Sequence, residues 1–269
     1  MADSPKENDG YHVRAVVRAV AILELLRDSD GAASLNELAR RSGMAKASVF
    51  RMLRSLEKTG MVERVPGRDV YRLGVRCLAL GQAYLEQTDL RTEAAFALER
   101  LRNEFDETVH LGVLDGEYRV VYLEKLETSH AVGVKMSRVG LSTASHCTSL
   151  GKALLAECEG DPVAELEERG ALRRYTPNTI TEPDALRAEL AETRRRGFSL
   201  DLEEHEPGVR CVAAAVPGPG GGALAAVSVS APAQRMPEEL LRGELAAATV
   251  AAAQEVGRRR GGAPRESTA

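Results

Sequence analysis

Tryptophan is absent from this 269-residue chain, and aromatic residues of all kinds make up only 4% of it. Its four cysteines, at positions 77, 147, 158 and 211, lack the C-x-x-C pairing typical of redox motifs and of many zinc sites. No stretch approaches the ~18 uninterrupted apolar residues of a membrane-spanning helix. The polar start, MADSPKENDG, does not resemble a signal peptide. These absences argue against a membrane partner and a disulfide framework, and they predict a cytoplasmic protein with reduced thiols.

The composition that remains suits globular domains. Apolar residues make up 43% of the chain, which is enough to bury a core. The length corresponds to one large domain or two ordinary ones. The two ends, residues 1–12 and 258–269, are polar or rich in glycine and arginine, and we expect both to be disordered.

Charge is distributed unevenly along the chain. Residues 1–74 carry 13 basic and 10 acidic residues, whereas the remainder carries 23 basic and 30 acidic ones. The excess of basic residues is concentrated in residues 32–74, which hold nine basic and four acidic residues. A compact basic module on an acidic body favours nucleic-acid binding by the module alone.

Residues 13–74 carry an ordered series of helix and strand signals. A helical stretch comes first. Ser34 is then placed to cap a short helix, LNELARRSG, with Glu37 completing a capping box and Gly43 ending the helix. A basic helix, MAKASVFRMLRSLEKTG, and a hairpin over MVERVPGRDVYRLG follow. This order is typical of a winged helix-turn-helix domain.

In such a domain the basic helix enters the major groove of double-stranded DNA, and the hairpin, or wing, reaches phosphates or the minor groove. The predicted contacts lie on the basic helix and on the wing: Lys46, Ala47, Ser48, Phe50, Arg51 and Arg54, with Arg64 and Arg68. The alternative is a small helical bundle with a solvated basic face. The hairpin that follows the basic helix favours DNA binding.

The rest of the chain reads as a linker and a second domain. Residues 75–89 predict a helix that links the domains and contributes to a dimer. Residues 90–257 mix helices and hairpins without the strand-helix-strand alternation of a parallel sheet. Apolar runs around Asp115-Gly116 predict a hairpin, and residues 130–136 and the segments VRCVAAAV and ALAAVSVSA predict further strands. The fold class is therefore predicted to be α+β, with a mainly antiparallel sheet.

Several patterns resemble enzyme sites. In GFSLDLEEHEPGVRCVAAAV, acidic residues surround His205, which lies six residues before Cys211. This pattern suggests either a metal site or a cysteine nucleophile. Zinc motifs place paired ligands two to four residues apart, and a cysteine in an apolar strand usually behaves as a small hydrophobic residue. The S-x-x-K match at Ser149 lacks the S-D-N and K-T-G motifs of penicillin-recognising enzymes. We predict no catalytic residue, metal or cofactor, and interpret His205 and its neighbouring glutamates as a solvated loop.

The same residues can instead form a recognition pocket. The first turn of a helix at TSLGK exposes backbone N–H groups and the positive end of the helix dipole, which favour a carboxylate. Ser228 and Ser230 are two residues apart in a strand and therefore point to one face. Together with Asp201 and Cys211 they can form a small polar pocket.

Three segments of the chain resemble the IclR family of bacterial transcriptional regulators, over about residues 13–257. They are the DNA-binding segment LNELARRSGMAKASVFRMLRSLEKTGMVER, the element SHCTSLGKALLA, and GFSLDLEEHEPGVRCVAAAV, with its spaced glycine, aspartate, glutamate and cysteine. Ala45 stands where proline is common, and Pro217-Gly218 replace the usual aromatic residue and Asp or Asn.

The resemblance implies a winged helix-turn-helix joined to an effector-binding domain of GAF-like fold. It also implies a homodimer or a dimer of dimers on palindromic operators. In glyoxylate-responsive members, including allantoin-utilisation repressors, an aspartate, a cysteine, two serines and backbone amides hold the ligand. The matching positions here are Asp201, Cys211, Ser228, Ser230, and the amides of Ser149 and Leu150.

We therefore expect a DNA-binding repressor of a catabolic operon, for allantoin or another source of glyoxylate, whose affinity for DNA is switched by a small carboxylate effector. A 2-oxo or hydroxy acid such as glyoxylate is the expected effector. One alternative is an activator of aromatic-acid catabolism that senses an aromatic carboxylate. Another is an enzyme that has kept the fold of a regulator.

Overall fold

The computed structural model describes residues 13–87, 89–134 and 137–262. The chain divides into two compact units, one ending at Gln87 and the other comprising the rest of the chain. The expected disordered leader, residues 1–12, lies outside the described residues, as do residues 263–269. Each unit is described by itself.

The first unit is a winged helix-turn-helix. Its elements are α1 (Arg14–Arg27), β1 (Ala33–Ser34), α2 (Leu35–Ser42), α3 (Lys46–Lys58), β2 (Val62–Arg64), β3 (Val70–Leu73) and α4 (Val75–Gln87). The strands form an antiparallel sheet in the order β1-β3-β2. The two-residue strand β1 was not predicted, because two residues are too few to show the alternation of apolar and polar residues that marks a strand.

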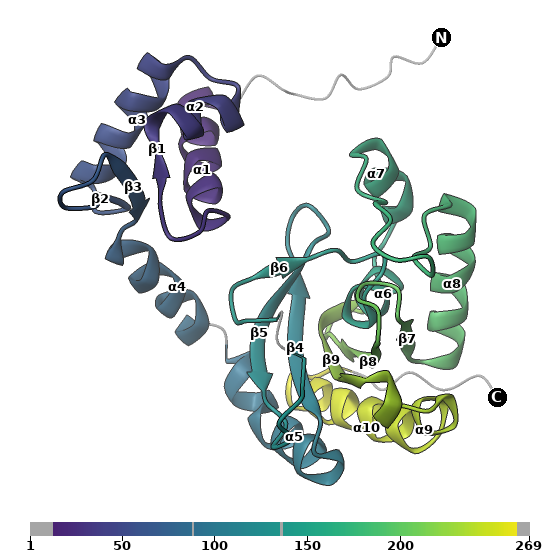
Figure 1. Ribbon diagram of the computed structural model, residues 1–269. Coiled ribbons are helices and arrows are strands. Elements are labelled where there is room, and N and C mark those ends of the chain that lie inside the picture. Colours follow the sequence, from purple (N-terminus) through teal and green to yellow (C-terminus); the bar gives the residue numbers. More distant parts are fainter. Residues whose placement is uncertain (1–12, 88, 135–136, 263–269) are drawn as a thin grey trace. The chain divides into compact units, whose positions relative to one another are not determined.

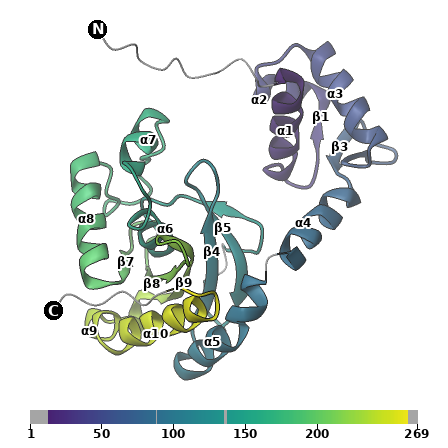
Figure 2. The same ribbon diagram turned by 180° about the vertical axis from the view of Figure 1, so that it is seen from behind.

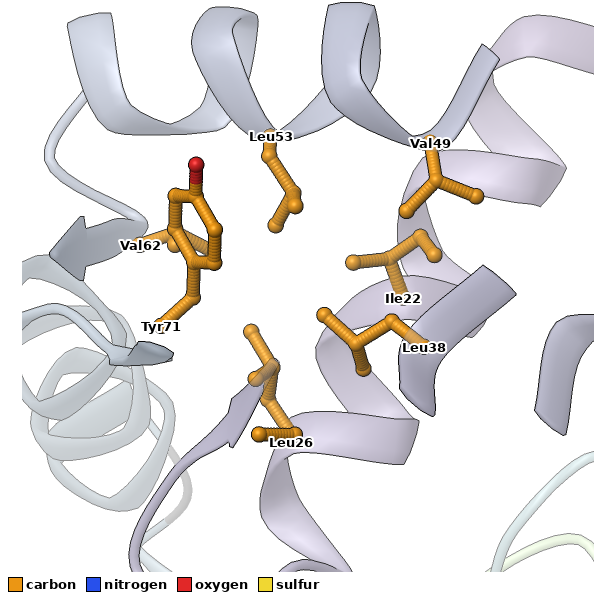
Figure 3. Packing of buried hydrophobic residues seen from close by; sticks show 8 residues of the cluster. Ile22, Leu26, Leu38, Val49, Leu53, Val62 and Tyr71 are labelled. Carbon is orange, nitrogen blue, oxygen red and sulfur yellow. The ribbon is translucent and has the colours of Figure 1, made fainter. Parts of the chain in front are cut away.

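Side chains from α1, α2, α3 and the sheet share one core in this unit. Figure 3 shows Leu38, Val49 and Leu53 pointing toward Ile22 and toward Tyr71 of strand β3. Val49 and Leu53 are four residues apart, so they lie on the same face of α3 and leave its opposite face to solvent. The core therefore fixes which side of α3 is exposed.

The turn between α2 and α3 forms as the sequence predicts. The Ser34 hydroxyl accepts a hydrogen bond from the Glu37 backbone N–H at 3.2 Å, which caps the start of α2. Gly43 ends α2 with φ of 66°, a left-handed conformation that glycine adopts without steric cost. These two signals, nine residues apart, set the length of α2.

The second unit is built on one curled sheet. Its elements are α5 (Leu90–Phe105), β4 (Thr108–Leu114), β5 (Val120–Leu126), β6 (Ser142–Thr143), α6 (Ser149–Leu155), α7 (Pro162–Glu168), α8 (Pro183–Arg196), β7 (Ser199–Leu202), β8 (Val209–Pro217), β9 (Ala223–Pro232), the 3-10 turn η1 (Ala233–Arg235), α9 (Glu238–Arg242) and α10 (Glu244–Arg259).

All neighbouring strands of this sheet are antiparallel, in the order β6-β5-β4-β9-β8-β7. Helices α5 and α10 pack against each other and against β4 and β8, and α6 packs on β7, β8 and β9. Figures 1 and 2 show α5 and α10 together beneath the strands and α6 lying in the hollow of the curl. The predicted α+β class and mainly antiparallel sheet are confirmed.

Two sequence-based expectations differ from this structure. Residues 130–134 form no strand, and a two-residue strand, β6, lies further along the chain instead. Helix α10 continues to Arg259, past the expected end of the ordered chain at residue 257. The Arg260 guanidinium then pairs with Glu93 at 2.6 Å, which ties residues predicted to be disordered to α5.

Within the described residues, no helix is both long and apolar enough to cross a bilayer.

Candidate functional site

The antiparallel ladder of the second unit places three of the predicted pocket residues side by side. Asp201 of β7 is paired with Cys211 of β8, and Cys211 is paired with Ser230 of β9. Residues directly opposite on neighbouring strands have Cβ atoms ~5 Å apart and share a face. All three side chains are buried. They therefore form one polar row across the sheet.

A second row runs parallel to the first, two residues further along. Ser199, Ala213, Ser228 and His110 occupy successive strands in register. The His110 ring is buried, with Nε2 2.7 Å from the Ser137 hydroxyl and Nδ1 3.5 Å from the Ser228 hydroxyl. Burial lowers the pKa of His110 to about 3, so its ring is neutral at physiological pH. A polar residue inside the apolar strand TVHLGV was the signal for His110 that the sequence analysis missed.

Helix α6 covers the two polar rows. The Ser199 hydroxyl donates to the Ser149 carbonyl at 2.6 Å, and the side chains of Ser149 and Leu150 are buried. A Cβ atom on Gly151 would lie 2.1 Å from the Ser145 carbonyl oxygen, so glycine is required for this close approach. The first turn of α6 therefore lies directly over the polar rows.

One cavity of about 620 Å³ is lined by residues of both polar rows and of the first turn of α6. The structure brings together all six predicted pocket residues on its wall: Ser149, Leu150, Asp201, Cys211, Ser228 and Ser230. The backbone N–H of Gly151 is already bonded to the Thr148 hydroxyl, so the free donors of the helix start are those before it.

Ser145 also lines the cavity and was not predicted. Its side chain is 2% exposed, and its hydroxyl has no hydrogen-bond partner among the residues that the structure describes. A buried hydroxyl without a partner costs about 1–3 kcal/mol. Ser145 therefore presents an unused donor and acceptor to whatever occupies the cavity.

Asp201 is the acidic group of the cavity. One of its carboxylate oxygens accepts a hydrogen bond from the Glu204 backbone N–H at 2.8 Å. Burial nevertheless raises the pKa of Asp201 to about 7, because the charged form loses its hydration. Near neutral pH the neutral and ionised forms of Asp201 are therefore both populated, and the neutral form can donate a hydrogen bond.

Cys211 has no features of a nucleophile. Burial raises the pKa of its thiol far above the ordinary value, and the nearby Asp201 carboxylate raises it further, although Ser230 and Ser149 stabilise the thiolate slightly. Reactive cysteines instead have a lowered pKa and partial exposure. Cys211 serves as a small, weakly polar wall of the cavity.

One sequence-based interpretation of the acidic loop is wrong. Glu204, expected in a solvated loop, is 6% exposed and pairs with the Lys152 ammonium, which is 1% exposed. Burial raises the pKa of Glu204, whereas the charge of Lys152 opposes that rise. Lys152 also lies 3.5 Å from Glu189. This ion pair ties α6 to the segment that carries Asp201, and neither partner was predicted.

His205 is part of the cavity wall rather than of a solvated loop. It is half-buried, its Nε2 lies 3.1 Å from the Thr143 hydroxyl, and its ring centroid is 5.1 Å from that of Tyr175. Burial lowers the pKa of His205, which favours the neutral ring. Across the described ranges, no three His, Cys, Asp or Glu side chains gather in a way that could hold a metal ion.

The first unit presents the predicted DNA-contacting residues on its surface. Seven of the eight are exposed, and Ser48 is half-buried: Lys46, Ala47, Ser48, Phe50, Arg51, Arg54, Arg64 and Arg68. Phe50, a large apolar side chain, is 46% exposed. In the wing, the Arg64 guanidinium pairs with Asp69 at 2.5 Å. A DNA phosphate that binds Arg64 therefore has to displace the Asp69 carboxylate.

Both units match one family of known proteins. Residues 15–66 match the IclR helix-turn-helix domain, and residues 82–258 match the C-terminal domain of the bacterial transcriptional regulator IclR. The transcriptional repressor IclR of Escherichia coli K12 is 30% identical over 245 residues, which cover 91% of this chain and 89% of that protein.

Solved structures agree with this match. A crystal structure from Silicibacter sp. TM1040, assigned to the IclR transcriptional regulators, has a TM-score of 0.81 and 31% identity, covering 94% of this chain and 98% of that one. An IclR homologue from Microbacterium hydrocarbonoxydans, solved in complex with 4-hydroxybenzoate, has a TM-score of 0.73 and 26% identity, covering 91% and 98%.

Both units match domains of DNA-binding transcriptional regulators, and this is the class of protein that the chain belongs to. The chain belongs to the IclR family of bacterial transcriptional regulators.

Proposed function

We propose that the protein is a cytoplasmic repressor of a catabolic operon, released from its operator by a small 2-oxo or hydroxy acid. Glyoxylate, as in allantoin-type metabolism, is the smallest such acid and the first to test. The observation that carries the proposal is Asp201, a carboxyl whose pKa is raised to about 7, set beside the hydroxyls of Ser228 and Ser230 in the buried part of the cavity.

The chemistry of the cavity fits an acid with a second polar group. Backbone N–H groups at Ser149 and Leu150 and the hydroxyl of Ser145 are donors for the anionic end. The neutral form of Asp201 donates to the ligand, whereas its ionised form accepts from a ligand hydroxyl, as in hydrated glyoxylate. An unsubstituted fatty acid has no such group, so it is expected to bind less tightly than a 2-oxo acid of equal size.

A direct test measures release of DNA. Operator fragments are first selected from genomic DNA by the purified protein, and their affinity is then measured with and without each acid. A ligand present at 100 times its dissociation constant also stabilises the protein by about 2.7 kcal/mol, so a thermal-shift screen of small acids precedes the DNA measurement. Failure of every 2-oxo and hydroxy acid to change either quantity would refute the proposed effector class.

An aromatic carboxylate remains the second candidate. It is supported by the 4-hydroxybenzoate bound to the Microbacterium homologue and by the His110 and Tyr122 rings, 5.1 Å apart, on the cavity wall here. Under this alternative, the protein activates an operon for aromatic-acid catabolism. Tight binding of 4-hydroxybenzoate with no response to glyoxylate selects this alternative.

DNA binding is proposed to use the exposed face of α3 and the wing. We expect Lys46→Ala and Arg51→Ala to weaken operator binding and Arg68→Ala to weaken it less. Loss of a base contact costs about 1–3 kcal/mol at one position, and loss of a phosphate contact lowers the salt slope by about one. Fluorescence anisotropy across a salt series measures both. Arg242→Ala, an exposed arginine of the second unit, is the control. Wild-type affinity in all three variants contradicts the assignment of α3 to the groove.

We further propose a homodimer, or a dimer of dimers, that binds a palindromic operator. The first unit exposes apolar side chains on α1 and α4, with Val16 60% exposed, Val17 56%, Val75 77% and Leu78 71%. A dimer that buries them makes the second half-site contact intramolecular. Sedimentation equilibrium at micromolar concentration is expected to show at least a dimer, and Val17→Glu with Leu78→Glu is expected to shift it toward monomer. A wild-type monomer excludes this proposal.

A further inference from the structure

The cavity is much larger than a two-carbon acid. Its volume is about 620 Å³. A molecule with five non-hydrogen atoms takes the space of three or four waters, roughly 100 Å³ at ~30 Å³ per water. Small-molecule sites bury most of the ligand surface. The polar rows around Asp201 therefore occupy one end of a longer site.

Arginines line the more exposed end. Arg119 is half-buried, and Arg169 and Arg173 are exposed, whereas the polar rows are fully buried. Arg169 already pairs with Glu165 at 3.5 Å. Arg119 donates to the Ser142 hydroxyl, and among the described residues neither Arg119 nor Arg173 has a carboxylate partner. These two guanidinium groups therefore have no carboxylate partner in the described part of the chain and can bind an anion.

Acidic residues also line the cavity. Glu117 and Glu206 are on its wall, and neither forms an ion pair with Arg119 or Arg173 within the described ranges. The charge of Arg169 is offset by its partner Glu165, so Arg119 and Arg173 balance these two glutamates in number. Because the glutamates lie beyond ion-pair distance, a ligand carboxylate can bind the two arginines directly.

The two ends are too far apart for a short acid to contact both. The Arg119 guanidinium donates to the hydroxyl of Ser142. Through Val121 of β5, Ser142 is in register with Val113 of β4, which is three residues from His110. At ~3.4 Å per residue, the guanidinium is level with a point about 10 Å along the strand from His110. A two-carbon acid spans about 3.5 Å, the length of one extended residue. Only a longer ligand reaches both ends.

We infer that the natural effector is a dicarboxylic acid of about five or six carbons with a 2-oxo or 2-hydroxy group. Its substituted end lies at Asp201, Ser228 and Ser230, and its second carboxylate binds Arg119 and Arg173. Arginine suits this role because its planar guanidinium binds a carboxylate through two parallel hydrogen bonds. The inference rests on the proposed function, since it extends the acid already assigned to the inner end.

The test compares two acids that differ only at the far end. 2-Oxoglutarate and 2-oxopentanoate share five carbons and the 2-oxo group, but the second ends in a methyl group. Calorimetry on the full chain is expected to show at least tenfold tighter binding of 2-oxoglutarate. Arg119→Gln is expected to remove most of that preference while leaving the affinity for 2-oxopentanoate within threefold of wild type. Arg173→Gln, at an exposed side chain, is the second variant, and Arg242→Gln is the control.

The outcomes separate this inference from the proposed function. Equal affinity for the two acids, an unchanged preference in both arginine variants, or tighter binding of glyoxylate than of either acid overturns the inference. In each of these cases the proposed function stands if the bound acid still releases operator DNA. If none of the three acids binds, the inference is overturned, and the proposed function fails as well when no other 2-oxo or hydroxy acid of the screen binds.

Discussion

Lys152→Met is expected to destabilise the second unit by about 3–5 kcal/mol, because it leaves the Glu204 carboxylate buried without its cation. One Glu204 oxygen already lacks a hydrogen-bond partner within the described residues, so no other donor is in place to compensate. Arg196, which shares the partner Glu189 with Lys152, is bound to that carboxylate at 2.8 Å. Removal of this one ammonium group is thus expected to lower the free energy of unfolding by about as much as a marginally stable domain has in total.

The pH dependence of this loss follows from the carboxyl. In the variant, burial raises the pKa of Glu204 without an opposing ammonium, so the folded state retains a proton that the unfolded state releases. Stability therefore falls as pH rises from the ordinary glutamate pKa through the raised value. The deficit of Lys152→Met is expected to be larger at pH 8 than at pH 5.

Controls distinguish the buried pair from a surface pair. Lys152→Met with Glu204→Leu removes both charges and is expected to recover most of the stability. Arg195→Met breaks the exposed pair with Glu192 and is expected to cost about 0–1 kcal/mol. Denaturant unfolding followed by far-ultraviolet circular dichroism measures all of these variants, and the chain has no tryptophan to report by fluorescence. A fully stable Lys152→Met at pH 8 contradicts this role of the pair.

Local signals in the sequence were sufficient to predict the helices and the hairpin of the first unit. Ser34, Gly43 and the hairpin turn act within a few residues of themselves, so capping and turn rules find them. The spacing of Val49 and Leu53 likewise predicts which face of α3 is buried. By contrast, β1 is two residues long and exists only because β3 pairs with it. Its formation depends on a partner that local rules do not consider.

The pocket was predictable only where a local period or a family motif marked it. Alternation along a strand places Ser228 and Ser230 on one face, and the family resemblance adds Asp201 and Cys211. Lys152 and Glu204 are 52 residues apart, so the spacing rules that apply within one element could not pair them. The raised pKa of Asp201 has the same origin, because it reflects burial by distant segments rather than neighbouring residues.

Asp201→Ala is expected to abolish the response to the effector while leaving DNA binding intact. The side chain is 3% exposed and central to the polar rows, whereas the α3 surface belongs to the other unit. Loss of a hydrogen bond to a charged ligand costs about 1.5–3 kcal/mol, and the emptied site adds to that loss. Ser228→Ala and Ser230→Ala are each expected to weaken binding by about 0.5–1.5 kcal/mol, as for a neutral hydrogen bond.

Asp201→Asn tests the protonation state. With its pKa raised to about 7, Asp201 is mostly neutral at pH 6 and mostly ionised at pH 8. Since an ionised carboxylate repels an anion, the wild-type affinity for a carboxylate effector is expected to fall as pH rises through 7, by up to tenfold per unit. Asparagine stays neutral, so the variant is expected to show a flat profile from pH 6 to 8. Calorimetry on the full chain measures the affinity, with Asp184→Asn, whose side chain is 99% exposed, as the charge control. An affinity that rises with pH in the wild type shows instead that ionised Asp201 accepts a hydrogen bond from a ligand hydroxyl.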